Sequence, residues 1–417
     1  MHIVIIGSGI IGLTSAWYIK KAGHEVSVID ALSGPAMETS FANGGLLSVG
    51  QSAPSGKPGL VKSVFKEFFN KNSPLKVKPD FTLHQISWLF QMLKECNTKS
   101  YNINLQRMIN MANFTRECFY KLKEEIDVEF DYQKGGILQL CENEEQMKAS
   151  KSQAKKLEKF NIKTKILSKD ELLKVEPGLK NSKKTFIGAL HFVNEESGDC
   201  HKFAKGLEKK LVNLGVKFHY GVTVKDIVVN DDKVEKLIAQ DNTTFTADAY
   251  VVATGAKTYN LLKNIVKVPV YPVKGYSLTL PVTHEENAIK HAAMDMSKMV
   301  AMARFTDRVV VAGYGEVMGF DDSIQNGHVE FLKDAFRSWF SNSVDFNKPN
   351  AWIGFRPMTP DGTPIISKTP KSNLYVNTGH GTYGWTMSCG SGQLLIDIID
   401  NKKTKINTHD YSLDRYK

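Results

Sequence analysis

The sequence has 417 residues, of which 42% are hydrophobic and 24% charged, and its formal net charge is +10. This length predicts two or three domains with a large core, and the composition is that of a globular protein and excludes disordered and fibrous classes. No apolar run reaches the roughly eighteen residues of a transmembrane helix, so we expect no membrane-spanning segment.

Cysteine spacing and charge distribution argue against a metal site, a catalytic thiol and a nucleic-acid partner. The five cysteines show no C-x-x-C spacing, so we interpret them as reduced packing thiols and expect neither a metal site nor a catalytic thiol. Residues 148–184 hold twelve lysines and four acidic residues. Aromatic residues do not interleave with these lysines as a single-strand binding groove requires. We interpret the segment as a solvated helix and loop, and expect no nucleic-acid partner.

A glycine turn between two apolar runs is the clearest pattern at the start of the chain. Residues 2–6 are β-branched or apolar and lead into a G-x-G-x-x-G match made of Gly7, Ser8, Gly9, Ile10, Ile11 and Gly12. Gly7 permits a tight turn, Gly9 lets a pyrophosphate approach, and Gly12 allows close helix packing. A helix over residues 13–21 then directs its N-terminal N–H groups at the phosphates.

The segment after this helix completes the unit. A second strand at residues 25–29 ends in Asp30 and Ala31, where a carboxylate accepts hydrogen bonds from a ribose. The unit predicts a dinucleotide site without separating NAD from FAD. Because the turn begins at residue 7, we also expect no signal peptide and a cytoplasmic location.

The loop that follows is rich in small polar residues and glycine. We predict that it contacts the cofactor rather than forming a plain surface loop, because it adjoins the ribose-binding acid. The predicted contacts are Ser40, Asn43, Gly44, Gly45 and Leu46.

Apolar helices are predicted in the next segment. Residues 60–69 place Leu60, Val61, Val64, Phe65, Phe68 and Phe69 on one broad face with lysines around it. Such a basic amphipathic helix either lies on a bilayer surface or covers a hydrophobic core, and both interpretations stay open. Further helices are predicted at residues 83–96 and 104–126.

The middle of the chain alternates between two predicted sheets. Residues 130–140 read as strand, turn and strand outside the first domain, and Asp199 is expected to cap a helix over residues 200–214. Residues 217–229, including Val224, are predicted to form one strand. Residues 244–256 end in Ala253, Thr254 and Gly255, a second place where backbone meets the dinucleotide. Residues 268–360 are predicted to form a second sheet with a helix at 328–340.

The last predicted unit is a strand, a glycine loop and a helix. The strand covers residues 373–377 and the helix residues 385–400, so the loop directs backbone N–H groups at an electron-rich ring. The predicted contacts in this loop are His380, Gly381, Thr382, Tyr383 and Gly384.

Four motifs in these segments resemble those of a known family. They are residues 38–43 (ETSFAN), 273–281 (VKGYSLTLP), 355–364 (FRPMTPDGTP) and 379–387 (GHGTYGWTM). They resemble the FAD-dependent D-amino-acid dehydrogenases, in the wider group of D-amino-acid oxidase, glycine oxidase and sarcosine oxidase. The resemblance covers nearly the whole chain.

The resemblance implies an α/β fold with a Rossmann-like FAD-binding domain of the glutathione-reductase type and a discontinuous substrate domain of antiparallel sheet plus helix. The FAD-binding domain is expected at residues 1–57, 191–265 and 361–417. The substrate domain, with a helical insertion, is expected at residues 58–190 and 266–360.

The resemblance also implies a reaction and its residues. A small D-amino acid, such as D-alanine or D-proline, is oxidised by hydride transfer from Cα to flavin N5, and electrons pass to a membrane quinone. Arg356 matches the arginine that holds the substrate carboxylate, and it adjoins the flavin as well. Arg304 is a second candidate, and Tyr276 and Tyr314 are candidate pocket residues. Residues 379–384 hold no cysteine, which predicts non-covalent FAD.

Other functions stay open at this point. A glycine- or sarcosine-type oxidase would pass electrons to oxygen. An FAD-dependent tRNA-modifying enzyme would use the net charge of +10. A non-catalytic flavin-binding scaffold is the third alternative. Membrane contact through residues 60–69 would make the protein peripheral on the inner face of the cytoplasmic membrane.

Overall fold

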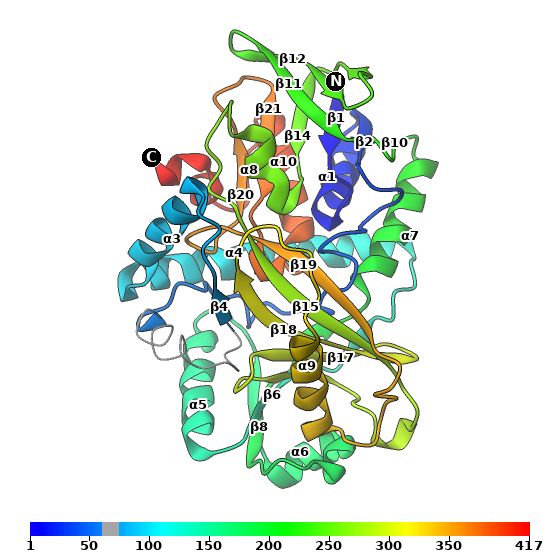
Figure 1. The fold of residues 1–417 in the computed structure, drawn as a ribbon, viewed down its shortest axis with the longest axis vertical. Coiled ribbons are helices and arrows are strands. Elements are labelled where there is room, and N and C mark those ends of the chain that lie inside the picture. Colours follow the sequence, from blue (N-terminus) through cyan, green and yellow to red (C-terminus); the bar gives the residue numbers. More distant parts are fainter. Residues whose placement is uncertain (61–74) are drawn as a thin grey trace.

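A largely parallel sheet built around the N-terminal strand organises one half of the molecule (Figure 1). The computed structural model describes residues 1–60 and 75–417. The sheet runs in the order β10 (Lys217–His219), β2 (Glu25–Ile29), β1 (His2–Ile6), β14 (Ala249–Val252), β21 (Leu374–Thr378) and β20 (Ile365–Lys368). The strands from β10 to β21 pair in parallel and β20 is antiparallel. Ile3, Val4 and Ile5 are fully buried, as expected for a strand covered on both faces.

Helices cover one face of this first sheet, and a small three-stranded sheet with one short helix covers the other. Four helices share a core with Ile3 and Ile5: α1 (Ile10–Lys21), α4 (Thr98–Ile126), α7 (Cys200–Asn213) and α10 (Ser388–Ile399). Val4 and Ile6 face α8 (Thr258–Leu262) and the strands β11 (Val224–Asn230), β12 (Lys233–Ala239) and β13 (Thr244–Phe245).

A second, mixed sheet forms the other half (Figure 1). Its order is β19 (Asn350–Met358), β15 (Tyr271–Pro281), β18 (Arg308–Val317), β17 (Val300–Arg304), β16 (Ala292–Asp295), β6 (Ile137–Cys141), β8 (Gly188–Phe192) and β7 (Thr164–Ser168), and β4 (Leu75–Val77) pairs with β18. One face packs on α9 (Asn326–Trp339) and α6 (Lys169–Val175). The other face packs on α4 and α5 (Glu144–Glu158).

Short elements connect the two halves. β3 (Leu46–Leu47), β9 (Glu196–Ser197) and β5 (Gln133–Lys134) form a small antiparallel sheet. α3 (Leu83–Glu95) begins at a Thr82 cap and inserts Trp88 beside β15 and β19, where its Nε1 donates to the Met358 carbonyl at 2.8 Å. The long helix α4 therefore contributes to the cores of both halves.

The predicted α/β fold is confirmed, with local corrections. Residues 217–229 do not form one strand: Gly221 adopts a positive φ of 71° between β10 and β11, which belong to different sheets. The last long helix begins at Ser388 rather than at residue 385, because residues 381–383 form a separate 3₁₀ turn. The helix predicted at residues 60–69 lies, apart from Leu60, outside the described residues. The five domain segments stay a prediction.

Candidate active site

The glycine turn after β1 is built as the sequence pattern predicts. Gly7 has a φ of 106°, and a Cβ added there would lie 2.6 Å from the Ala253 carbonyl oxygen. A Cβ on Gly12 would lie 1.8 Å from the Gly7 carbonyl oxygen. At Gly9 the nearest atom to an added Cβ is Ser40 Oγ at 3.7 Å, so this position is open. Gly7 and Gly12 thus serve backbone packing, and Gly9 leaves room for a ligand.

Asp30 follows β2 and is held in place by main-chain donors. The Ser8 N–H donates to its carboxylate at 2.6 Å, and the Leu32 N–H donates at 2.9 Å. The Ser8 hydroxyl adds a third bond at 2.7 Å. These bonds fix the carboxylate at the carboxyl end of the strand, where open α/β sheets bind ligands.

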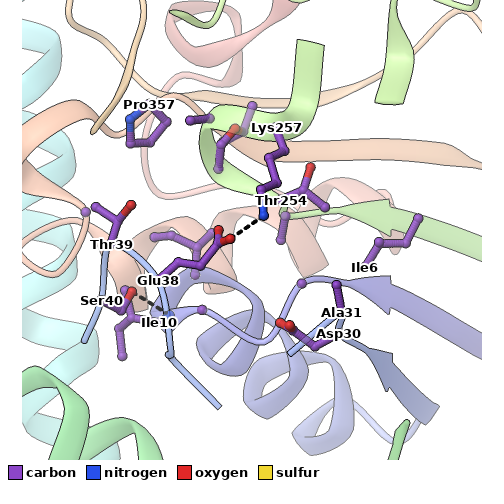
Figure 2. Close-up of a pocket in the computed structure, with 18 of the residues that line it drawn as sticks. Ile6, Ile10, Asp30, Ala31, Glu38, Thr39, Ser40, Thr254, Lys257 and Pro357 are labelled. Carbon is purple, nitrogen blue, oxygen red and sulfur yellow. Dashed lines mark hydrogen bonds and ion pairs between the residues drawn. The ribbon is translucent and has the colours of Figure 1, made fainter. Parts of the chain in front are cut away.

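A cavity of about 600 Å³ lies at this edge of the first sheet (Figure 2). It receives residues from each segment predicted to contact the cofactor. The predicted residues that line it are Gly7, Gly9, Ile10, Ile11, Asp30, Ala31, Ser40, Asn43, Val224, Ala253, Thr254, Gly255, His380, Gly381, Thr382 and Gly384. Ser8 and Gly12 lie in the surrounding structure instead, and Gly44, Gly45, Leu46, Arg356 and Tyr383 line a neighbouring cavity.

Sequence reasoning missed an ion pair at this cavity. Glu38 pairs with Lys257, and the two side chains approach each other from separate segments (Figure 2). Beside it, the Ile10 N–H donates to Ser40 Oγ at 3.2 Å. Other lining residues that were missed are Ile6, Ile29, Leu32, Met37, Thr39, Val222, Thr223, Lys225, Ala256, Asn260, Leu261, Phe320, Pro357, Asn377, Thr378 and Trp385. Most of them adjoin predicted contacts, so proximity in the sequence was the available signal.

Three of the nine buried side-chain polar atoms that lack a hydrogen-bond partner in the described part of the chain belong to residues that line this cavity. Within the described chain, Asn377 Oδ1, His380 Nδ1 and Trp385 Nε1 make no hydrogen bond. The other His380 nitrogen, Nε2, bonds with Ser391 Oγ at 2.9 Å. Burial lowers the pKa of His380 to about 3, so its imidazole is neutral near pH 7. Buried polar groups are normally satisfied, so these atoms favour a polar ligand.

A second cavity of about 190 Å³ adjoins the first. The two share Thr39, Asn43, Gly381, Thr382 and Trp385 as walls. The second cavity extends over the face of the mixed sheet opposite α9, where Ala301 and Ala312 contribute small side chains. Ligands in the two cavities would therefore be neighbours.

Arg356 supplies the charge of the second cavity. Its Nη1 donates to the Tyr314 carbonyl oxygen at 2.7 Å, and among the described residues no carboxylate forms an ion pair with it. Burial lowers the pKa of Arg356 to about 10, and the nearby Tyr383 acts in the opposite direction. Gly275 lies directly beneath the guanidinium, since an added Cβ there would meet Cζ at 2.4 Å. A partly buried cation with neutral partners favours an anionic ligand.

The other three candidates take different positions. Arg304 pairs with Glu285 and lines neither cavity, so the second candidate for the carboxylate is placed outside the site. Tyr276 lines the second cavity, yet its hydroxyl donates to Glu316 at 2.9 Å in the buried layer near α9. Tyr314 packs its ring in the core under α9 and offers only its carbonyl to Arg356. The alternation of side chains between the two faces of a strand decides these orientations, and the sequence motifs do not show which face each side chain occupies.

A glycine turn at the carboxyl ends of parallel strands, with a large cavity beside it, is typical of dinucleotide-binding α/β proteins. The family described as FAD dependent oxidoreductase (DAO) matches residues 2–398, and the chain belongs to this family. FAD is thus its cofactor, and the open Gly9, the fixed Asp30 and the unpartnered atoms of Asn377, His380 and Trp385 fit that ligand.

Solved structures share this fold at low sequence identity. Glycine oxidase from Geobacillus kaustophilus has a TM-score of 0.77 and 19% identity, covering 99% of this chain and 97% of that chain. Glycine oxidase from Bacillus cereus ATCC 14579 has a TM-score of 0.74 and 20% identity, covering 98% and 97%. L-Proline dehydrogenase from P. horikoshii has a TM-score of 0.73 and 18% identity, covering 100% and 97%.

Proposed function

We propose that the protein catalyses FAD-dependent oxidative deamination of small D-amino acids and passes the electrons to a quinone. The observation that carries this proposal is Arg356, a partly buried guanidinium with no carboxylate partner among the described residues, in a cavity that adjoins the cofactor cavity. A substrate carboxylate completes this site, because a guanidinium fork binds a carboxylate through two parallel hydrogen bonds. The four sequence motifs support the D-amino-acid assignment.

The lining of the second cavity limits the substrate side chain. Arg356 is the one charged residue among the described residues that line it, and Met294, Met299, Ala301, Ala312 and Trp352 make much of the wall apolar. Placing a second charge there without a partner would be unfavourable. We therefore expect small neutral amino acids such as alanine or proline, and exclusion of dicarboxylates and of basic amino acids.

The reaction needs little from side chains beyond positioning. When bound, FAD accepts a hydride from the substrate Cα. Arg356 fixes the carboxylate, and the described lining offers no aspartate, glutamate, lysine or histidine as a base for the amine. The amine proton therefore leaves to solvent, and the walls around Gly381 and Trp385 hold the substrate beside the cofactor. The five cysteines are free, and residues 379–384 hold none of them, which supports non-covalent FAD.

The proposed quinone acceptor lies in a membrane, and an apolar stripe on α3 supports contact of the protein with a membrane surface. Leu83, Ile86, Phe90 and Leu93 are exposed, at 85%, 59%, 59% and 48%, while Trp88 of the same helix is buried. Lys94 lies 4.7 Å from the Phe90 ring, and the chain carries a net charge of +10. This combination suits an anionic lipid surface. None of the described helices has the length and hydropathy needed to cross a bilayer, so the proposed association is peripheral.

Vesicle flotation tests this contact. We expect Ile86→Glu combined with Phe90→Glu to reduce flotation with phosphatidylglycerol vesicles, with FAD content unchanged. Val212→Glu is the matched control, because Val212 is also exposed and α7 lies on the opposite side of the molecule (Figure 1). The pair Phe65→Glu and Phe68→Glu tests residues 60–69 in the same way. Unchanged flotation of both pairs would remove the membrane contact.

Anaerobic reduction of bound FAD by a panel of D- and L-amino acids tests the reaction itself. We expect bleaching by small neutral D-amino acids, loss of roughly 2–5 kcal/mol of transition-state stabilisation in Arg356→Ala, and little change in Arg304→Ala. These two arginines lie in the same sheet, so the pair separates carboxylate binding from a general charge effect. Bleaching by L-amino acids alone, or equal behaviour of the two variants, would contradict the proposal.

The alternatives give distinct results in the same preparation. Rapid peroxide formation in air would favour an oxidase, as in the similar folds named glycine oxidase. Salt-sensitive tRNA binding would favour an RNA-modifying flavoprotein, for which the exposed lysines of α5 are the structural support. A flavin that no amine reduces would favour a scaffold.

A further inference from the structure

Strand β18 contains a bulge at a residue with an unusual backbone. Opposite it, β15 advances two residues from Lys274 to Tyr276, whereas β18 covers three between their partners Glu316 and Gly313. Tyr314 lies within this extra stretch and has a φ of 66°. A bulky non-glycine residue in the left-handed region is strained by about 1–3 kcal/mol, and such residues gather at functional sites. Bulges also redirect groups beside active sites.

The bulge directs a main-chain carbonyl at Arg356. Strands β19 and β18 lie on opposite sides of β15, so the Arg356 side chain must cross β15 to reach the Tyr314 oxygen at 2.7 Å. It crosses at Gly275, where the missing Cβ leaves room for the guanidinium. In a regular strand this carbonyl would join the ladder between strands instead of accepting from a side chain above the sheet.

The Tyr314 ring anchors the bulge from the other face of the sheet. Tyr314 is 5% exposed, and the centroid of its ring lies 4.0 Å from the His328 ring and 5.6 Å from the Phe331 ring, both on α9. The Tyr276 ring approaches edge-on at 5.8 Å, and Lys76 Nζ lies 5.7 Å from the centroid. This packing opposes relaxation of the strained backbone.

We propose that Tyr314 is a positioning residue for the anion site, acting through its left-handed main-chain carbonyl and not through its phenol. The carbonyl holds one arm of the guanidinium, and this leaves the other nitrogens to bind a carboxylate in a fixed orientation. That the carboxylate belongs to an amino acid rests on the proposed function. The positioning itself concerns any carboxylate that enters the second cavity.

A substitution series at position 314 tests this in the FAD-loaded protein. Tyr314→Gly and Tyr314→Ala both remove the ring and differ in the ease of a positive φ. If the alanine at position 314 leaves the left-handed conformation in most molecules, the fraction of protein whose carbonyl holds Arg356 falls. The apparent affinity for a carboxylate falls by the same factor. We expect Ala to weaken binding about 10-fold relative to Gly, Asn to resemble Gly, and Tyr314→Phe to resemble the wild type.

Two readouts separate this inference from the proposed function. The first is the dissociation constant of benzoate, measured by its perturbation of the flavin spectrum, which needs no turnover. The second is the division between KM and kcat for the best D-amino acid, where we expect the change mainly in KM. The inference would be overturned if Tyr314→Gly and Tyr314→Ala bind benzoate with equal affinity, or if Tyr314→Phe and Tyr314→Asn both bind it weakly. If the wild type binds benzoate but oxidises no D-amino acid, the proposed function fails and the series still decides the role of Tyr314.

Folding is checked by FAD content and melting temperature. Glycine normally weakens a strand relative to alanine. If Tyr314→Gly is nonetheless the more stable of the two variants, the left-handed strain is demonstrated independently of any ligand. A lower stability of Tyr314→Gly would contradict the strain on which the inference depends.

Discussion

The replacement Gly275→Ala tests whether the Arg356 guanidinium must lie flat on β15. The added Cβ would lie 2.4 Å from Arg356 Cζ and Nη1, against an ordinary contact of 3.4 Å or more, so the guanidinium must retreat by about 1 Å. Gly275 itself has no positive φ, and β15 accepts alanine there without backbone strain. The side chain that must move is flexible, so the fold should survive and the damage should be local.

The expected loss follows from two effects. A retreat of about 1 Å stretches the bond to the Tyr314 carbonyl, and a hydrogen bond to a charged group contributes about 1.5–3 kcal/mol. A misplacement of about 1 Å in a positioning group reduces rates by up to about 100-fold. We therefore expect kcat/KM to fall roughly 10- to 100-fold, with FAD content and melting temperature nearly unchanged.

The assay is anaerobic stopped-flow reduction of bound FAD over a range of substrate concentrations. Gly327→Ala is the control, because nothing lies within 4 Å of an added Cβ there and the residue lies in α9 of the same half of the molecule. Should Gly275→Ala stay within twofold of this control, the guanidinium does not act from its position over β15. A loss of activity that matches loss of FAD would point to misfolding.

Three further predictions concern the cofactor cavity. Gly12→Ala places a Cβ 1.8 Å from the Gly7 carbonyl oxygen, so we expect low FAD content and a lowered melting temperature. Gly9→Ala meets no atom closer than 3.7 Å, so we expect normal folding and loss of FAD alone; retained FAD would show that the pyrophosphate lies elsewhere. Burial lowers the pKa of His380 from 6.5 to about 3. The contribution of the neutral His380 to the free energy of unfolding is therefore fully present above pH 6.5 and is lost as the pH falls toward 3. At pH 5, which is 1.5 units below 6.5, the free energy of unfolding is lower by about 2 kcal/mol, at about 1.36 kcal/mol for each pH unit. Denaturant titrations at several pH values measure this loss, and His380→Asn should abolish this part of the pH dependence.

Local sequence patterns were sufficient for the cofactor turn. Gly7, Gly12 and Asp30 act within one strand-turn-helix-strand unit, and their roles follow from steric limits that a short motif expresses. Arg356 was also named in advance, through a motif; it lines the second cavity, and its role in binding a carboxylate stays a prediction. Its partner, the Tyr314 carbonyl, was not predicted. Tyr314 lies 42 residues from Arg356 in the sequence, and its carbonyl is directed at the guanidinium by a bulge between β15 and β18, so there is no local sequence signal.

The orientation of side chains in the mixed sheet is the main feature that could not be predicted from the sequence. Arg304 was predicted as a second anion ligand from its residue type, yet it pairs with Glu285, which comes from a separate turn. Gly44 and Gly45, which were expected beside the cofactor, line the second cavity and not the first, since this loop passes from one cavity to the other; their contact with the cofactor stays a prediction. One residue of register decides which cavity or face a side chain reaches.

The shared walls of the two cavities explain why distant motifs belong to one site. Thr39 and Asn43 come from the loop after β2, and Gly381, Thr382 and Trp385 from the loop before α10. Thr39 also donates its hydroxyl to the Phe355 carbonyl at 2.8 Å, which ties the first of these loops to the strand that carries Arg356. A cofactor in the first cavity and the proposed carboxylate in the second would thus both contact the same two loops. Their relative position then depends on a few short contacts rather than on the rigidity of the whole molecule.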